Sequence, residues 1–171
     1  MDCLQHSILL AILLAAVIMD FAWQKIRNWL IGAGLILGAG LRFYSGGMQG
    51  LEESVMGILF PAICLWILFL FRVLGAGDIK LFSVIGGFAG VESMPGCIAA
   101  AFILGAVLAA VKIIRNRNIM SRLQYLAAYI TKTISTKEIE PYYQASEGTG
   151  NIIHFSLAIF GGYLIYMGGF F

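Results

Sequence analysis

The chain has 171 residues, of which 60% are hydrophobic and only 12% are charged, whereas a soluble domain is about 45–50% apolar. This composition excludes an ordinary soluble globular protein. Eleven Lys and Arg against nine Asp and Glu leave a formal net charge of +2, which is too small for a protein that must neutralise many nucleic-acid phosphates. The three cysteines form no CxxC pair and indicate neither a zinc site nor a disulfide framework.

Apolar runs of helical length follow one another along the chain, separated by charged or glycine-rich residues. A bilayer core of about 30 Å needs roughly 20 apolar residues per helix, and a helix satisfies its own backbone polar groups in lipid. The pattern therefore predicts an all-α polytopic membrane protein, a single domain over residues 1–171 with about six spans. The spans are expected at residues 4–23, 29–44, 55–73, 79–91, 97–114 and 152–170.

The basic residues predict the orientation of these spans. Ten of the eleven lie in or beside the loops after the first, third and fifth spans, and only Arg42 lies elsewhere. By the positive-inside rule those loops are cytoplasmic and both termini are extracytoplasmic. The long cytoplasmic loop covers about residues 115–151, and apolar residues recur at helical spacing over 119–134. This spacing predicts an amphipathic helix on the cytoplasmic leaflet, either a connector lying on lipid or a surface that docks a substrate.

Small residues predict where these helices pack closely. Gly34 with Gly38, and Gly86 with Gly90, form small-xxx-small pairs, which let helix backbones approach one another in membranes. The histidine at the start of the last span, His154, has no metal-ligand spacing and is interpreted as an interfacial side chain.

Two aspartates lie where spans meet the cytoplasmic side, and an ionisable group in such a place is a functional hypothesis. Asp20 precedes Lys25 by five residues, roughly 7 Å at the rise of a helix. Asp78 lies where the third loop enters the fourth span, so both carboxylates are expected at similar depth. Two carboxylates in a partly dry cleft cannot both ionise cheaply, so one keeps its proton while the other can activate water. Gly75 and Gly77, which lack a Cβ, would let an extended substrate approach Asp78.

Each aspartate also has a plainer interpretation. Asp78 would cap a helix N-terminus in a tight turn, and Asp20 would reach the interface and pair with Lys25 or Arg27. A small transporter or channel that uses both acids to bind a cation or relay protons is a further alternative. Transporters are expected to hold such acids near the bilayer midplane, however, whereas these two are expected at the cytoplasmic edge.

The two aspartates belong to two sequence motifs, DFAWQKIRNW at residues 20–29 and GAGDIKL at residues 75–81. The first resembles the first signature of the type IV prepilin peptidases, in which an Asp precedes a basic-Ile-Pro-Asn run. The second is similar to the GxGDxKL signature of the same membrane aspartic proteases. Arg27 stands where the family usually has Pro, which removes a rigid turn but no catalytic atom.

The resemblance implies an aspartic endopeptidase that removes the short basic leader from prepilin-like or preflagellin-like proteins at the cytoplasmic face of the cell membrane. It matches Asp20 and Asp78 to the catalytic pair and implies no metal or organic cofactor. Other motif residues that we expect to position the substrate are Lys25, Asn28, Gly75, Gly77 and Lys80.

The partners implied are the bilayer and a substrate whose basic leader precedes an apolar helix, and no nucleic acid. Larger relatives carry an N-terminal extension with paired CxxC motifs and an N-methyltransferase activity. This chain resembles instead the short peptidases of Flp/Tad-type pili and the archaeal preflagellin peptidases, so we expect peptidase activity without methylation. A non-catalytic membrane subunit of a pilus or secretion complex is the remaining alternative.

Overall fold

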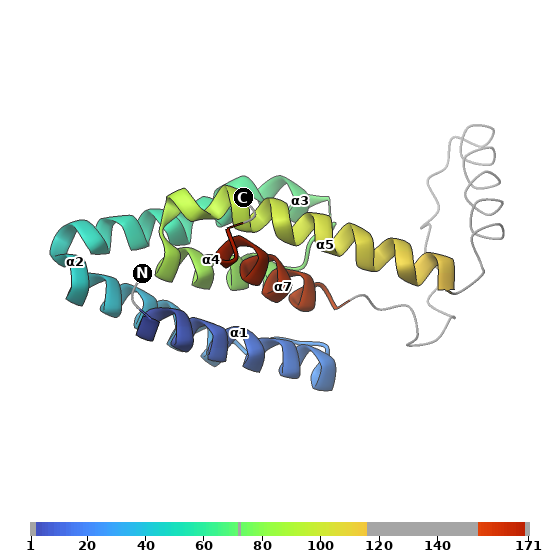
Figure 1. The fold of residues 1–171 in the computed structure, drawn as a ribbon, viewed down its shortest axis with the longest axis horizontal. Helices are drawn as coiled ribbons and strands as arrows, with labels where there is room; N and C mark the ends of the chain where they lie inside the picture. Colours follow the sequence, from blue (N-terminus) through green and yellow to red (C-terminus); the bar gives the residue numbers. More distant parts are fainter. Residues whose placement is uncertain (1–2, 72, 116–153, 170–171) are drawn as a thin grey trace. The chain divides into compact units, whose positions relative to one another are not determined.

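A computed structural model describes residues 3–71, 73–115 and 154–169 (Figure 1). All regular structure in these ranges is helical, which confirms the predicted all-α class. The predicted amphipathic segment, residues 119–134, lies outside the described residues. The elements are α1 (Cys3–Trp23), α2 (Asn28–Cys64), α3 (Trp66–Leu70), α4 (Ala76–Ala89), the 3₁₀ turn η1 (Val91–Ser93), α5 (Met94–Arg115) and α7 (Phe155–Met167).

The chain divides into two compact units. The first comprises Met1–Gly105 and His154–Phe171, and the second comprises Ala106–Ile153. Both aspartates and all helix contacts described below lie in the first unit. Within the described ranges, three helical stretches are long and apolar enough to cross a membrane: Cys3–Trp23, Asn28–Cys64 and Val91–Lys112. The predicted count of six spans remains a prediction.

The longest helix, α2, contains a sharp bend. Only Gly47 leaves helical geometry, with φ 61° and ψ −141°, a conformation that glycine adopts without the strain of a Cβ. Gly50, just after the bend, lies against the backbone of Arg42, so the second segment of α2 returns beside the first (Figure 1). We predicted a loop between residues 44 and 55, but the helix continues on both sides of Gly47. Met, Gln, Leu and Glu in this stretch favour helix, and one glycine is enough for the bend.

The short helix α4 occupies the centre of the first unit. Its nine consecutive residues from Leu81 to Ala89 are buried, and it contacts α1, α2 and α7 (Figure 1). A helix that is apolar on every side is a core element. At 14 residues α4 is about 21 Å long, which is shorter than a bilayer core.

The close packing predicted for the small-residue pairs is present around α4. A Cβ added at Gly34 or at Gly38 would lie within 2.8–2.9 Å of an α4 side chain. Gly86 lies against the carbonyl of Gly57 so tightly that a Cβ would collide with that backbone. Gly90 differs, because its φ of 81° ends α4 beside the guanidinium of Arg42. Glycine therefore lets both segments of α2 contact α4 at backbone distance.

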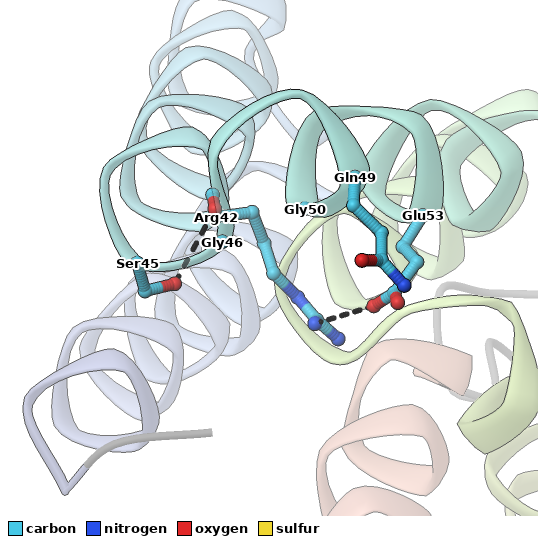
Figure 2. Close-up of a pocket in the computed structure, with 6 residues that line it drawn as sticks. All are labelled: Arg42, Ser45, Gly46, Gln49, Gly50 and Glu53. Atoms are coloured by element: carbon cyan, nitrogen blue, oxygen red, sulfur yellow. Dashed lines mark hydrogen bonds and ion pairs between the residues drawn. The ribbon is translucent and has the colours of Figure 1, made fainter.

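Arg42 joins the bend of α2 to the end of α4. Its Nε donates to the carbonyl of Phe88 at 2.8 Å, and its Nη1 pairs with Glu53 at 2.8 Å. Figure 2 shows the Arg42 side chain extending toward Glu53. Both residues line an open pocket with a volume of about 330 Å³. Arg42 lies 14 residues after Asn28 on the first segment of α2, so the pocket is about 21 Å along the helix axis from the start of α2. The residues lining the pocket are Arg42, Ser45, Gly46, Gln49, Gly50 and Glu53.

Candidate active site

Asp20 lies in the last turn of α1, and its side chain is 19% exposed. Its Oδ2 accepts a hydrogen bond from the Ser156 hydroxyl at 2.6 Å and lies 3.2 Å from Nδ1 of His154. Both partners come from the N-terminal end of α7, where His154 is the residue before the first turn. The ring of Phe21 stacks on the imidazole, with centroids 4.2 Å apart. The carboxylate is therefore held at a helix N-terminus, the end whose dipole favours an anion.

Asp78 lies in the first turn of α4, outside the three helical stretches that could span a membrane. Its side chain is partly buried, and its carboxylate accepts a hydrogen bond from the backbone N–H of Gly75. Burial raises the pKa of Asp78 to about 6; the Gly75 N–H opposes this rise, and the negative charge of Asp20 adds to it. The charge of Asp20 is the smallest of these three influences on Asp78.

The two sequence motifs contact each other beside the aspartates. Nζ of Lys80 donates to Oδ1 of Asn28 at 3.0 Å, and the Ile26 side chain lies 3.8 Å from the position of a Cβ on Gly77. Lys80 and Asn28 thus tie the start of α4 to the start of α2 rather than bonding to Asp78. This contact gives the lysine and the asparagine of the two motifs a structural partner in each other.

Lys25 is the motif residue that the fold does not bring into contact. It is exposed in the bend between α1 and α2 and forms no hydrogen bond or ion pair within the described part of the chain. The alternative pairing of Asp20 with Lys25 or Arg27 is also not observed there, since the partners of Asp20 come from α7.

Neither partner of Asp20 is evident from the sequence. The sequence favours an interfacial role for His154, whereas the structure places its ring against Asp20, and no motif singles out Ser156. They lie 134 and 136 residues from Asp20 along the chain, and α7 is apolar enough that its sequence does not indicate which face meets α1. One signal was available: the predicted topology places the start of the last span at the same cytoplasmic depth as Asp20.

The described residues offer no cluster of three or more His, Cys, Asp or Glu side chains that could hold a metal ion. The acidic side chains for which the structure shows a mutual electrostatic influence at this end are Asp20 and Asp78.

A family model described as the type IV leader peptidase family matches residues 7–110. The chain belongs to the type IV leader peptidase family. The match runs from α1 into α5 and includes both aspartates and both motifs, which confirms the resemblance found in the sequence. His154 and Ser156 lie beyond the matched region. No curated protein and no solved structure matches the chain.

Proposed function

We propose that this member of the type IV leader peptidase family is a membrane aspartic endopeptidase, and that Asp20 and Asp78 are its catalytic pair. The observation that carries the proposal is the family match over residues 7–110, which includes Asp20, Asp78 and both motifs. The contribution of the Asp20 charge to the raised pKa of Asp78 supports it. One carboxyl buried beside another keeps its proton at a pH where an isolated one is ionised. This is the charge state that peptide hydrolysis by two aspartates requires.

In the proposed reaction the pair works as one acid and one base. The ionised carboxylate takes a proton from a water molecule, whose oxygen attacks the scissile carbonyl carbon. The protonated carboxyl donates to the carbonyl oxygen as negative charge develops there. No other side chain is needed to move a proton.

The proposed substrate is a prepilin-like protein with a short basic leader followed by an apolar helix. Such a leader lies in the cytoplasm and the helix in the membrane, so the scissile bond lies at the cytoplasmic boundary. Asp20 lies at the end of α1 that precedes Lys25 and Arg27, and by the positive-inside rule we assign this end to the cytoplasm. The six-span layout with both termini outside belongs to the same proposal.

The test is cleavage of a prepilin co-expressed with the full chain, followed by the gel shift that leader removal produces. Asp20→Asn and Asp78→Asn are compared with Glu52→Gln, which makes the same carboxylate-to-amide change at an exposed position near the bend of α2. We expect at least a 1,000-fold loss in each aspartate variant, by analogy with the loss of other catalytic triad or dyad members. Glu52→Gln is expected to cleave like the wild type.

Membrane levels of each variant serve as the control for folding. Normal cleavage by either aspartate variant would exclude the dyad and favour a subunit or transporter role. Uptake of a cation that depends on both aspartates, with no cleavage of any prepilin offered, would favour the transporter directly.

A further inference from the structure

The two aspartates of the pair have different hydrogen-bond surroundings. Asp20 faces the hydroxyl of Ser156 and the imidazole of His154, whereas Asp78 accepts one backbone N–H at the start of its own helix. Hydrogen bonds to a carboxylate oxygen favour its charged form, and donors to a charged group are stronger than neutral pairs. The hydrogen bonds to Asp20 therefore help to determine which of the two carboxyl groups is ionised.

The donors are also held in place. Ser156 is fully buried, and its bond to Oδ2 is short at 2.6 Å. His154 is fixed by the ring of Phe21 stacked on its imidazole. A carboxylate accepts hydrogen bonds but donates none, so a bond from His154 to an ionised Asp20 requires the proton on Nδ1.

We propose that Ser156 and His154 are positioning residues that hold Asp20 as the ionised member of the pair. Asp20 is then the base that activates water, and Asp78 is the acid that faces the scissile carbonyl. This inference rests on the proposed peptidase function. It deepens that function by giving each aspartate its role and by adding two residues from α7 that lie outside the region matched by the family model.

The geometry leaves one oxygen of Asp20 available for the reaction. Both donors bind Oδ2, and no side chain in the described ranges donates to Oδ1. Water gives a proton to Oδ1, its oxygen bonds to the carbonyl carbon, and the carbonyl oxygen takes the proton of Asp78. The Asp20 proton then passes to the amide nitrogen as the C–N bond breaks, and one hydroxyl of the diol returns a proton to Asp78. One water is consumed, and both carboxyl groups regain their starting states.

The first test measures kcat and KM of the purified full chain on a prepilin substrate. Ser156→Ala and His154→Leu remove one donor each, while Ser156→Thr and His154→Asn keep a donor. The matched controls are Ser54→Ala, which removes another fully buried hydroxyl, bonded to the Gly87 carbonyl, and His6→Leu, which removes the other histidine.

We expect Ser156→Ala and His154→Leu to lower kcat by about 10- to 100-fold, the effect of one hydrogen bond to a charged group, with little change in KM. The conservative variants are expected to recover most of this loss, and the controls to cleave like the wild type. Wild-type kcat in both donor-deleting variants contradicts the proposal. An equal loss in Ser54→Ala, or no recovery with Thr and Asn, also contradicts it, since those results indicate a structural role only.

The second test measures the charge state of each aspartate by NMR, independently of enzyme activity. The chain contains only three aspartates, Asp2, Asp20 and Asp78, so ¹³C labelling of the aspartate side chains gives three carboxyl NMR signals. Asp20→Asn and Asp78→Asn assign them in the full chain embedded in lipid nanodiscs. At pH 5 we expect the Asp20 signal at the position of a carboxylate and the Asp78 signal at that of a carboxylic acid. Removing both donors, with Ser156→Ala and His154→Leu together, is expected to move the Asp20 signal toward the acid position.

The two tests separate failure of this inference from failure of the proposed function. A protonated Asp20 beside an ionised Asp78, in a chain that cleaves prepilin through both aspartates, overturns the inference and leaves the peptidase function intact. Absence of cleavage by the wild type overturns the peptidase function, and with it the catalytic roles assigned here, whatever charges the NMR signals report.

Discussion

At the scale of single residues, Asp20 and Asp78 carry the same carboxyl group but differ in burial and in hydrogen-bond partners. Asp20 lies in the last turn of a long helix and contacts Ser156 and His154 at the start of α7, while Asp78 lies in the first turn of a short core helix and is partly buried. Removal from water raises the pKa of Asp78 toward 6, because burial disfavours the charged form of an acid. Asp78, which we propose takes part in the reaction, therefore lowers the stability of the fold when it is ionised.

This cost predicts that Asp78→Asn stabilises the protein at neutral pH. The pKa of Asp78 is 3.8 in the unfolded reference and about 6 in the fold, so the folded state binds the proton more tightly. Stability of the wild type therefore falls as the pH rises from about 4 to 6 and stays lower above that range. Asparagine carries no charge and avoids this loss. We expect a gain of about 1–3 kcal/mol at pH 7.5 and none at pH 4.

Thermal unfolding in detergent at the two pH values measures this gain. Glu52→Gln is the control, because Glu52 is exposed and its change is expected to have little effect at either pH. A gain of equal size at pH 4 and pH 7.5 would show that the charge of Asp78 is not its cause.

The residues of the proposed site differ in how visible they are in the sequence. Asp20, Asp78 and the glycines beside Asp78 stand out because they lie in short motifs with recognisable residue types and spacing, and their roles stay predictions. Ser156 does not stand out in the sequence, because a single serine in an apolar helix indicates a functional role only when its contact with a carboxylate is known. Contact between residues 136 positions apart depends on the packing angle of α7, which its nearly uniform apolar sequence does not determine.

At the scale of elements, the packing of α2 on α4 positions Asp78, which lies in the first turn of α4. Both segments of α2 approach α4 through glycine, and Gly86 meets Gly57 backbone to backbone. In membranes, where apolar surface gains little by leaving lipid, close contact of small residues is a main source of helix association. The start of α4, which carries Asp78, is positioned by this contact and by the Lys80 bond to Asn28.

We therefore predict that Gly86→Ala disrupts the fold. Its methyl group would collide with the Gly57 carbonyl, which is backbone and cannot rotate away. The expected destabilisation is about 3 kcal/mol or more, at the upper end of overpacking effects. Gly32→Ala is the matched control: it lies in α2 with no atom within 4 Å of the added Cβ, and its effect is expected to be a gain of about 0.5–1 kcal/mol from helix propensity.

Thermal unfolding and the yield of protein in the membrane check this pair of variants. Equal stability of Gly86→Ala and Gly32→Ala would contradict the close contact of α2 with α4.

Sequence analysis located the elements but not their continuity. Hydropathy predicts apolar helices before and after residues 44–55, and both are present. The second, expected over residues 55–73, instead ends at Cys64 and is followed by the short helix α3. Sequence analysis treated the polar, glycine-rich stretch between the two as a loop, whereas the structure has helix on both sides of Gly47. Polar residues at a bend and polar residues in a loop look alike in composition, and only the backbone angle at one glycine distinguishes them.

At the scale of the whole molecule, the described helices have two chemically different ends. The end with the aspartates carries the exposed Lys25, Arg27 and Lys80, and the bend of α2 carries Glu52 and Glu53 with one paired arginine, Arg42. An excess of Lys and Arg marks the cytoplasmic side of membrane proteins. Arg42 is the basic residue at the acidic end. Its charge is paired with Glu53 and its Nε donates to the Phe88 carbonyl, so it adds no unpaired positive charge there.

This difference predicts the orientation in the membrane, which cysteine labelling measures in intact cells. Cys3 and Cys64 are exposed and are first replaced with serine, while Cys97 is buried and stays. Gly46→Cys, at the pocket near the bend (Figure 2), is expected to react with a membrane-impermeant maleimide from outside. Gln24→Cys, at the bend after α1, is expected to react only after the membrane is permeabilised, and it leaves the basic residues in place. The reverse pattern would put the aspartates outside, where a cytoplasmic leader does not reach them, and would contradict the proposed substrate even if the dyad is intact.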